Sequence, residues 1–255
     1  MNNLFSIRRL SVLLNKDLRQ SFLVSFNTLL VFASSYAFLC IFSLFTSFQF
    51  TPDDRIPFFF LFTLLFVMML PRLVYGNVND KVKGIEYGML PVSYLEKFVS
   101  MIITVGIVAP LCFVLAIFTL DNLFVLISPE DMGAVGFFWD GARYGINISS
   151  TLESLGSMFL IQIPFVLGNL YFRGHKVTKT ALLLILVHIV LIAILIIFGM
   201  RYAISNPFEG STEEQLYDMV ADSNIDKWIY VIYYYVIPVV LLVLSLLKIK
   251  KLQYK

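Results

Sequence analysis

The sequence predicts an all-α integral membrane protein with six transmembrane helices and both termini in the cytoplasm. The composition, the lengths of the apolar segments and the distribution of Lys and Arg predict this class. Of the 255 residues, 59% are hydrophobic and 14% are charged, whereas soluble domains are roughly half apolar and about a quarter charged. One water-soluble core of this length cannot bury so many apolar side chains, so a lipid bilayer is the expected solvent.

Six segments are mainly apolar over about the 20 residues that a spanning helix requires. They cover residues 22–45, 56–74, 98–120, 155–172, 181–200 and 228–247. The second segment has a short uncharged core, because Pro71 and Arg72 follow it, and we expect Arg72 to reach the lipid headgroups. Residues 22–247 are therefore predicted to form one transmembrane domain.

The basic residues orient this domain. If the N-terminus is cytoplasmic, the Lys and Arg residues on the opposite side are Arg55, Arg143, Arg201 and Lys227, and the other 15 of the 19 are cytoplasmic. Cytoplasmic segments of membrane proteins carry an excess of Lys and Arg. We therefore expect external loops at about 121–154 and 201–227, and a basic cytoplasmic tail over 248–255.

Residues 1–21 are predicted to form an amphipathic helix along the inner leaflet, with membrane lipid as its partner. Its apolar residues recur at helical spacing, and they are Ile7, Leu10, Leu13, Leu14 and Leu18. The basic residues among the polar positions are Arg8, Arg9, Lys16 and Arg19.

The sequence lacks the motifs of common catalytic sites. It contains no G-x-x-x-x-G-K-[ST], H-E-x-x-H, G-x-S-x-G or C-x-x-C pattern, and Cys40 and Cys112 lie within apolar runs, which argues against a disulfide or a metal site. No basic block with interleaved aromatic residues indicates nucleic acid as a partner. We therefore expect no enzyme activity and no bound cofactor, and any ATP hydrolysis would need another subunit.

Polar residues within the predicted spans are candidates for a translocation path. They are Asn27, Ser34, Ser35, Gln162, Asn169 and His188. Each can line a path or hydrogen-bond neighbouring helices together, and the second interpretation is favoured for any one of them. His188 is either a proton relay or substrate contact, or a helix-interface histidine bonded to a nearby carbonyl, and the interface is again favoured.

The predicted cytoplasmic loop at about 75–97 is longer and more structured than a connector needs to be. A short helix is expected after the turn residues that end at Gly84, and Pro91 would end it. Ser93 is a predicted N-cap, and Glu96 completes a capping box at the start of the third span. The short helix carries apolar side chains that need a covering partner, and they are Ile85, Tyr87, Met89 and Leu90.

Six spans, the amphipathic N-terminal helix and the pattern Lys83-Gly84-x-Glu86-Tyr87-x-Met89-Leu90-Pro91-Val92-Ser93-x-x-Glu96 resemble ABC-2-type transporter permeases. The resemblance implies the membrane subunit of an ABC exporter in the bacterial inner (cytoplasmic) membrane. It implies pairing with a second copy or a homologous permease, and a separate cytoplasmic ABC ATPase subunit that binds ATP and Mg²⁺.

The same resemblance implies that residues 84–90 are a coupling helix that docks on the ATPase, and that residues 91–93 are a stiff joint to the third span. The residues assigned to coupling are Gly84, Ile85, Glu86, Tyr87, Met89, Leu90, Pro91, Val92, Ser93 and Glu96. Closure of the ATPase pair would then rock the spans between two packings and move a substrate outward. The alternative is a non-transporting immunity or sensor protein whose external acidic loops bind a ligand.

Overall fold

The computed structural model describes residues 5–46, 52–80, 83–127, 136–138, 145–205 and 230–253, and helices make up nearly all of them. Five helical stretches are long and apolar enough to cross a membrane, namely Ile7–Ser43, Pro57–Tyr75, Tyr94–Ile127, Lys176–Ile194 and Ile232–Leu252. A shorter apolar helix covers Gly156–Tyr171, where the fourth span is predicted. The helical, multi-pass membrane character of the chain is therefore confirmed.

The regular elements follow the chain in the order in which the spans are predicted. The helices are α1 (Ile7–Phe45), α2 (Pro52–Tyr75), α3 (Lys83–Gly88), α4 (Tyr94–Met101), the π-helix η1 (Ile102–Val108), α5 (Ala109–Ile127), α7 (Ile148–Tyr171), α8 (Lys176–Ser205), the π-helix η2 (Ile232–Val236) and α11 (Ile237–Gln253). Between α5 and α7, β1 (Gly136–Phe138) and β2 (Gly145–Asn147) form a short parallel pair. These strands are the one departure from helix among the described residues.

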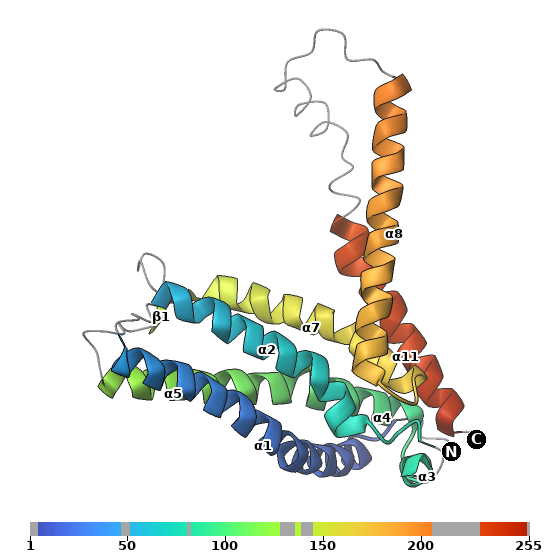
Figure 1. Cartoon of the computed structure of the whole chain (residues 1–255). Coiled ribbons are helices and arrows are strands. Elements are labelled where there is room, and N and C mark those ends of the chain that lie inside the picture. The colour runs from blue at the N-terminus through green and yellow to red at the C-terminus, as the bar shows by residue number, and fades with distance from the viewer. Residues whose placement is uncertain are drawn as a thin grey trace.

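Four helices, α1, α2, α5 and α7, lie side by side, whereas α8 and α11 run across them and project away (Figure 1). Helix α1 packs on α2, α4 and α5, and α7 packs on α2, α8 and α11. The core between the four helices is aromatic at its centre, where the Phe66 and Phe113 rings stack with their centroids 4.1 Å apart. Helix α1 begins and α11 ends at the same end of the molecule, beside α3 (Figure 1).

The first helix differs from its prediction. Residues 7–21 are not a separate amphipathic helix but the first turns of α1, which is continuous to Phe45 and changes direction along its length (Figure 1). The sequence between the two expected helices contains no Gly or Pro that would end a helix. The buried face of these turns is also more polar than expected, because it carries Asp17, Ser21 and Ser25 beside Leu13.

Two expected external loops begin later than predicted. Helix α5 continues through residues 121–127, and α8 continues to Ser205. Asp121 suggested a loop because a carboxylate is costly inside a membrane protein. In the structure this side chain is buried and accepts a hydrogen bond from the Tyr36 hydroxyl at 2.6 Å, so the helix continues past it. Residues 206–229, which include most of the second expected external loop, lie outside the described residues.

Each π-helix ends just before a proline. The segment η1 is followed by Pro110 and η2 by Pro238. A proline has no N–H, and its ring clashes with the carbonyl four residues earlier, so a wider turn before it relieves the clash. The prolines therefore produce local changes of helix geometry while the helices continue.

Candidate functional site

The candidate site is the segment between α2 and α4, which the sequence analysis assigned to coupling. Two turn hydrogen bonds follow α2, from the Val78 amide to Tyr75 and from the Asp80 amide to Asn77, at 3.2 and 3.0 Å. Gly84 then packs so closely on this turn that an added Cβ would lie 2.6 Å from the Val78 carbonyl oxygen. Only glycine allows this approach without a shift of the backbone.

Helix α3 has two different faces. Tyr87 points toward the protein, where its ring packs edge-on against Tyr75 at 6.0 Å between centroids. Burial, reinforced by the charge of Asp17, raises the pKa of the Tyr87 hydroxyl. Ile85 and Met89 face outward and are 52% and 79% exposed. The predicted partner-binding set therefore divides, with Tyr87 holding α3 in place and the other two side chains free to meet a partner.

The joint between α3 and the third span has the predicted capping box. The Glu96 amide donates to Ser93 Oγ at 3.2 Å, and the Ser93 amide donates to Glu96 Oε2 at 2.8 Å. Before it, the Val92 amide donates to the Leu90 carbonyl at 2.7 Å, which closes a tight turn around Pro91. Helix α3 ends at Gly88, a little before the predicted end of the coupling segment.

Glu96 also ties this joint to the beginning of α1. Its Oε1 accepts from the Ser6 amide at 2.6 Å and from the Arg9 guanidinium at 3.2 and 3.0 Å. The Glu96 side chain is fully buried and that of Arg9 is 42% exposed. One carboxylate therefore joins two segments 87 to 90 residues apart, and the sequence pattern predicted only its local half.

A lysine fixes the other end of α3. Lys97 Nζ donates to the Gly88 carbonyl at 3.1 Å and lies 5.3 Å from the centre of the Tyr87 ring. Carbonyls at the end of a helix have no partner within it, and a cation favours that position. Lys97 is itself buried, so the sequence interpretation of it as an ordinary cytoplasmic charge missed its role.

Asp17 is a second buried carboxylate near this segment. Its Oδ2 accepts from the Tyr75 hydroxyl and from Ser100 Oγ, each at 2.7 Å. It thereby joins α1 to the end of α2 and to α4, the two helices that flank the candidate segment. In the sequence its only signal is a polar residue on the otherwise apolar stripe that includes Leu13.

The structure does not bring the six candidate path residues together. Asn27, Ser34 and Ser35 are exposed on α1, and both serines donate to a carbonyl of their own helix, at 3.0 and 2.8 Å. Gln162 and Asn169 are buried on α7. No shared cavity among the described residues contains members of both groups.

Gln162 and Asn169 hold helices together, which is the favoured interpretation of the two. Gln162 Nε2 donates to the Val105 carbonyl of η1 at 2.9 Å, and Asn169 Nδ2 donates to the Tyr75 carbonyl at 3.0 Å. Both acceptors lie where the regular helical bonding is interrupted, in a π-helix and at a helix end. A side-chain donor there satisfies a carbonyl that would otherwise be buried without a partner.

His188 lies on the exposed side of α8 and bridges two helices. Its Nδ1 is 2.8 Å from the Leu184 carbonyl oxygen, and its Nε2 is 3.2 Å from the Tyr233 hydroxyl of η2. This is the helix-interface arrangement that the sequence analysis favoured over a proton relay. The part of the chain that the structure describes places no carboxylate within ion-pair distance of it.

A third polar cluster joins the opposite ends of the helices. Arg55 of α2 lies 3.4 Å from Asp121 of α5, the same carboxylate that accepts from Tyr36 of α1, and all three side chains are buried. Sequence reasoning placed Arg55 and Asp121 in external loops. The signal that was available is their opposite charge at the ends of adjacent predicted spans.

The chain matches no protein-family model, and comparisons with curated proteins and with solved structures found no match.

Proposed function

We propose that this chain is the transmembrane permease subunit of an ATP-driven ABC transporter, and that it exports its substrate. In this proposal it spans the bacterial inner membrane six times with both termini in the cytoplasm. It works as a dimer, with a second copy or a homologous permease, and each permease rests on a separate cytoplasmic ATPase that binds ATP and Mg²⁺.

The observation that carries the proposal is the construction around α3. A coupling helix must transmit force, so it needs a rigid attachment to the spans and a free face for the ATPase. Gly84, Tyr87 and Lys97 attach α3 on its inner side, and Glu96 fixes the joint that follows. The outer side presents Ile85 and Met89 to solvent, which is unusual for large apolar side chains on a short loop helix.

The attachment of α3 extends to several membrane helices at once. Asp17 links α1 with α2 and α4, and Glu96 links α4 with α1. A push on α3 would therefore reach three helices through short hydrogen bonds rather than through a flexible loop. The shared location of the start of α1 and the end of α11 (Figure 1) supports an even number of crossings.

The test is co-purification from the native membrane of the chain and of a variant with Ile85→Asp and Met89→Asp. We expect a P-loop ATPase to co-purify with the native chain and to be lost from the variant, because two charges would disrupt an apolar docking face. The variant leaves Tyr87 unchanged, since a charge at that inward position would unfold α3 and confuse the result.

A matched control carries Ile7→Asp and Val12→Asp. These side chains are 77% and 69% exposed near the start of α1, so the control adds the same charges to exposed apolar positions away from α3. It should retain the ATPase. Equal loss in both variants would refute docking through α3. If no ATPase accompanies the native chain while other membrane complexes stay intact, a membrane immunity or sensor role replaces transport.

A further inference from the structure

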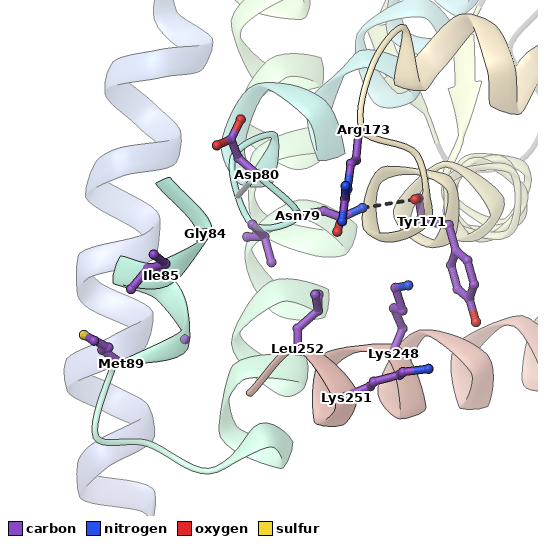
Figure 2. Close-up of a pocket in the computed structure, with 12 residues that line it drawn as sticks. Asn79, Asp80, Gly84, Ile85, Met89, Tyr171, Arg173, Lys248, Lys251 and Leu252 are labelled. Carbon is purple, nitrogen blue, oxygen red and sulfur yellow. Dashed lines mark hydrogen bonds between the residues drawn. The ribbon is translucent and has the colours of Figure 1, made fainter. Parts of the chain in front are cut away.

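A cleft of about 720 Å³ opens between α3, the connection that follows α7, and the last turns of α11. Its volume lies within the roughly 300–1,000 Å³ of small-molecule sites. Figure 2 shows Arg173 on one wall, where α7 leads into α8, and Lys248 and Lys251 along α11 on the opposite wall. Asn79 donates to the Tyr171 carbonyl at 3.0 Å and closes the inner end.

The cleft is strongly basic. Arg173, Lys248 and Lys251 line it, and Asp80 is the single carboxylate among the described lining residues. Lys248 and Lys251 are three residues apart on one helix, so they lie on the same face and repel each other. Within the described part of the chain, neither Arg173 nor Lys251 forms an ion pair with a carboxylate. An anion between the walls would relieve this repulsion.

The position of the cleft selects the kind of anion. It lies at the end of the apolar stretches Gly156–Tyr171 and Ile232–Leu252, where a membrane helix meets the headgroups. Tyr171 is half-exposed there, and Lys248 Nζ lies 4.3 Å from the centre of its ring, as is typical of the interfacial belt. Leu252 and Ile85 add an apolar edge to the basic walls.

We infer that this cleft binds the phosphate headgroup of an anionic phospholipid from the leaflet on this side of the membrane. Arg173 supplies a planar fork that matches phosphate oxygens, and the two lysines supply point charges from the facing wall. The apolar edge contacts the glycerol and the first part of the acyl chains. Basic pockets between membrane helices bind anionic headgroups in this way. The inference does not depend on the transporter proposal.

The test measures lipid binding to the whole purified chain in detergent by native mass spectrometry, with phosphatidylglycerol and phosphatidylcholine as probes. We expect the native chain to bind phosphatidylglycerol about tenfold or more tightly than phosphatidylcholine. A variant with Arg173→Gln, Lys248→Gln and Lys251→Gln should lose at least about tenfold in affinity for phosphatidylglycerol, since each cation near a membrane surface contributes roughly fivefold.

A control variant removes three exposed basic side chains from the same side of the molecule, through Arg8→Gln, Lys179→Gln and Lys250→Gln. It should bind phosphatidylglycerol nearly as the native chain does. An equal loss in the control would overturn the inference, because binding would then follow total charge. Equal binding of phosphatidylcholine by the native chain would overturn it as well.

Two further measurements use the native chain alone, so they do not depend on whether the variants fold. A tenfold rise in salt should release phosphatidylglycerol and spare phosphatidylcholine, because salt screens charge interactions; retention of phosphatidylglycerol would contradict the inference. Glycerol 3-phosphate should fail to displace phosphatidylglycerol. Displacement at concentrations equal to those of the lipid would assign the cleft to a soluble phosphate compound and overturn the lipid assignment.

Discussion

The replacement Glu96→Gln tests the joint between α3 and the third span most directly. The two carboxylate oxygens accept on opposite sides, Oε1 from Ser6 and Arg9 and Oε2 from Ser93. A glutamine keeps the shape of the side chain but replaces one acceptor oxygen with an NH₂ donor. Whichever way the amide turns, that donor faces an N–H that has lost its acceptor.

The size of the effect follows from burial. A hydrogen bond to a charged group contributes about 1.5–3 kcal/mol and a neutral one about 0.5–1.5 kcal/mol. Glutamine weakens one backbone contact and removes the other, which costs about 2 kcal/mol. Because 42% of the Arg9 side chain is exposed, solvent screening limits its share to about 0.5 kcal/mol. The expected total is about 2 to 3 kcal/mol of local stability.

Hydrogen–deuterium exchange measures this local stability in the intact protein. A loss of about 2 kcal/mol raises the population of the open form roughly 30-fold. We expect faster exchange at both ends that Glu96 joins, the first turn of α1 and the first turn of α4. Amides in the core near Phe113 should exchange as before, since they lie outside this contact.

Two other variants separate the halves of the site. Ser93→Ala removes only the side-chain cap of the Glu96 amide, at a cost of about 1 kcal/mol, and should affect α4 but not α1. Arg9→Gln should have a small effect. If Glu96→Gln leaves the start of α1 unchanged, or if Arg9→Gln is as damaging as Glu96→Gln, the proposed role of the buried carboxylate is wrong.

Three further predictions concern packing and charge. Gly84→Ala should cost about 1–3 kcal/mol in thermal unfolding and lower ATPase co-purification, because its Cβ would overlap the preceding turn, whereas Gly88→Ala should be tolerated because the nearest listed neighbour would be 3.9 Å away. Asp121→Asn should destabilise the protein by about 3 kcal/mol because it removes the carboxylate beside buried Arg55, and a combined Arg55→Met and Asp121→Leu variant should be more stable than that single variant. Tyr87→Phe should change the unfolding temperature little, since the buried hydroxyl has no hydrogen-bond partner among the described residues, and a large loss would show that this hydroxyl contributes to stability.

The sequence determined the features that depend on neighbours along the chain. Apolar runs of about 20 residues predicted five of the membrane-length helices near their observed positions. The capping box from Ser93 to Glu96 was predicted correctly because both partners lie within one helical turn. The same holds for the break near Pro91, since a proline restricts its own backbone and that of the residue before it.

The tertiary structure alone decided which polar groups meet. Asp17, Arg55, Lys97 and Asp121 read as surface charges in the sequence, yet all four are buried. Their partners come from other helices, and helical periodicity gives the spacing along one face without saying which neighbour that face contacts. The inward position of Tyr87 was hidden for the same reason, because an apolar side chain on a six-residue helix fits a partner surface and a protein core equally well.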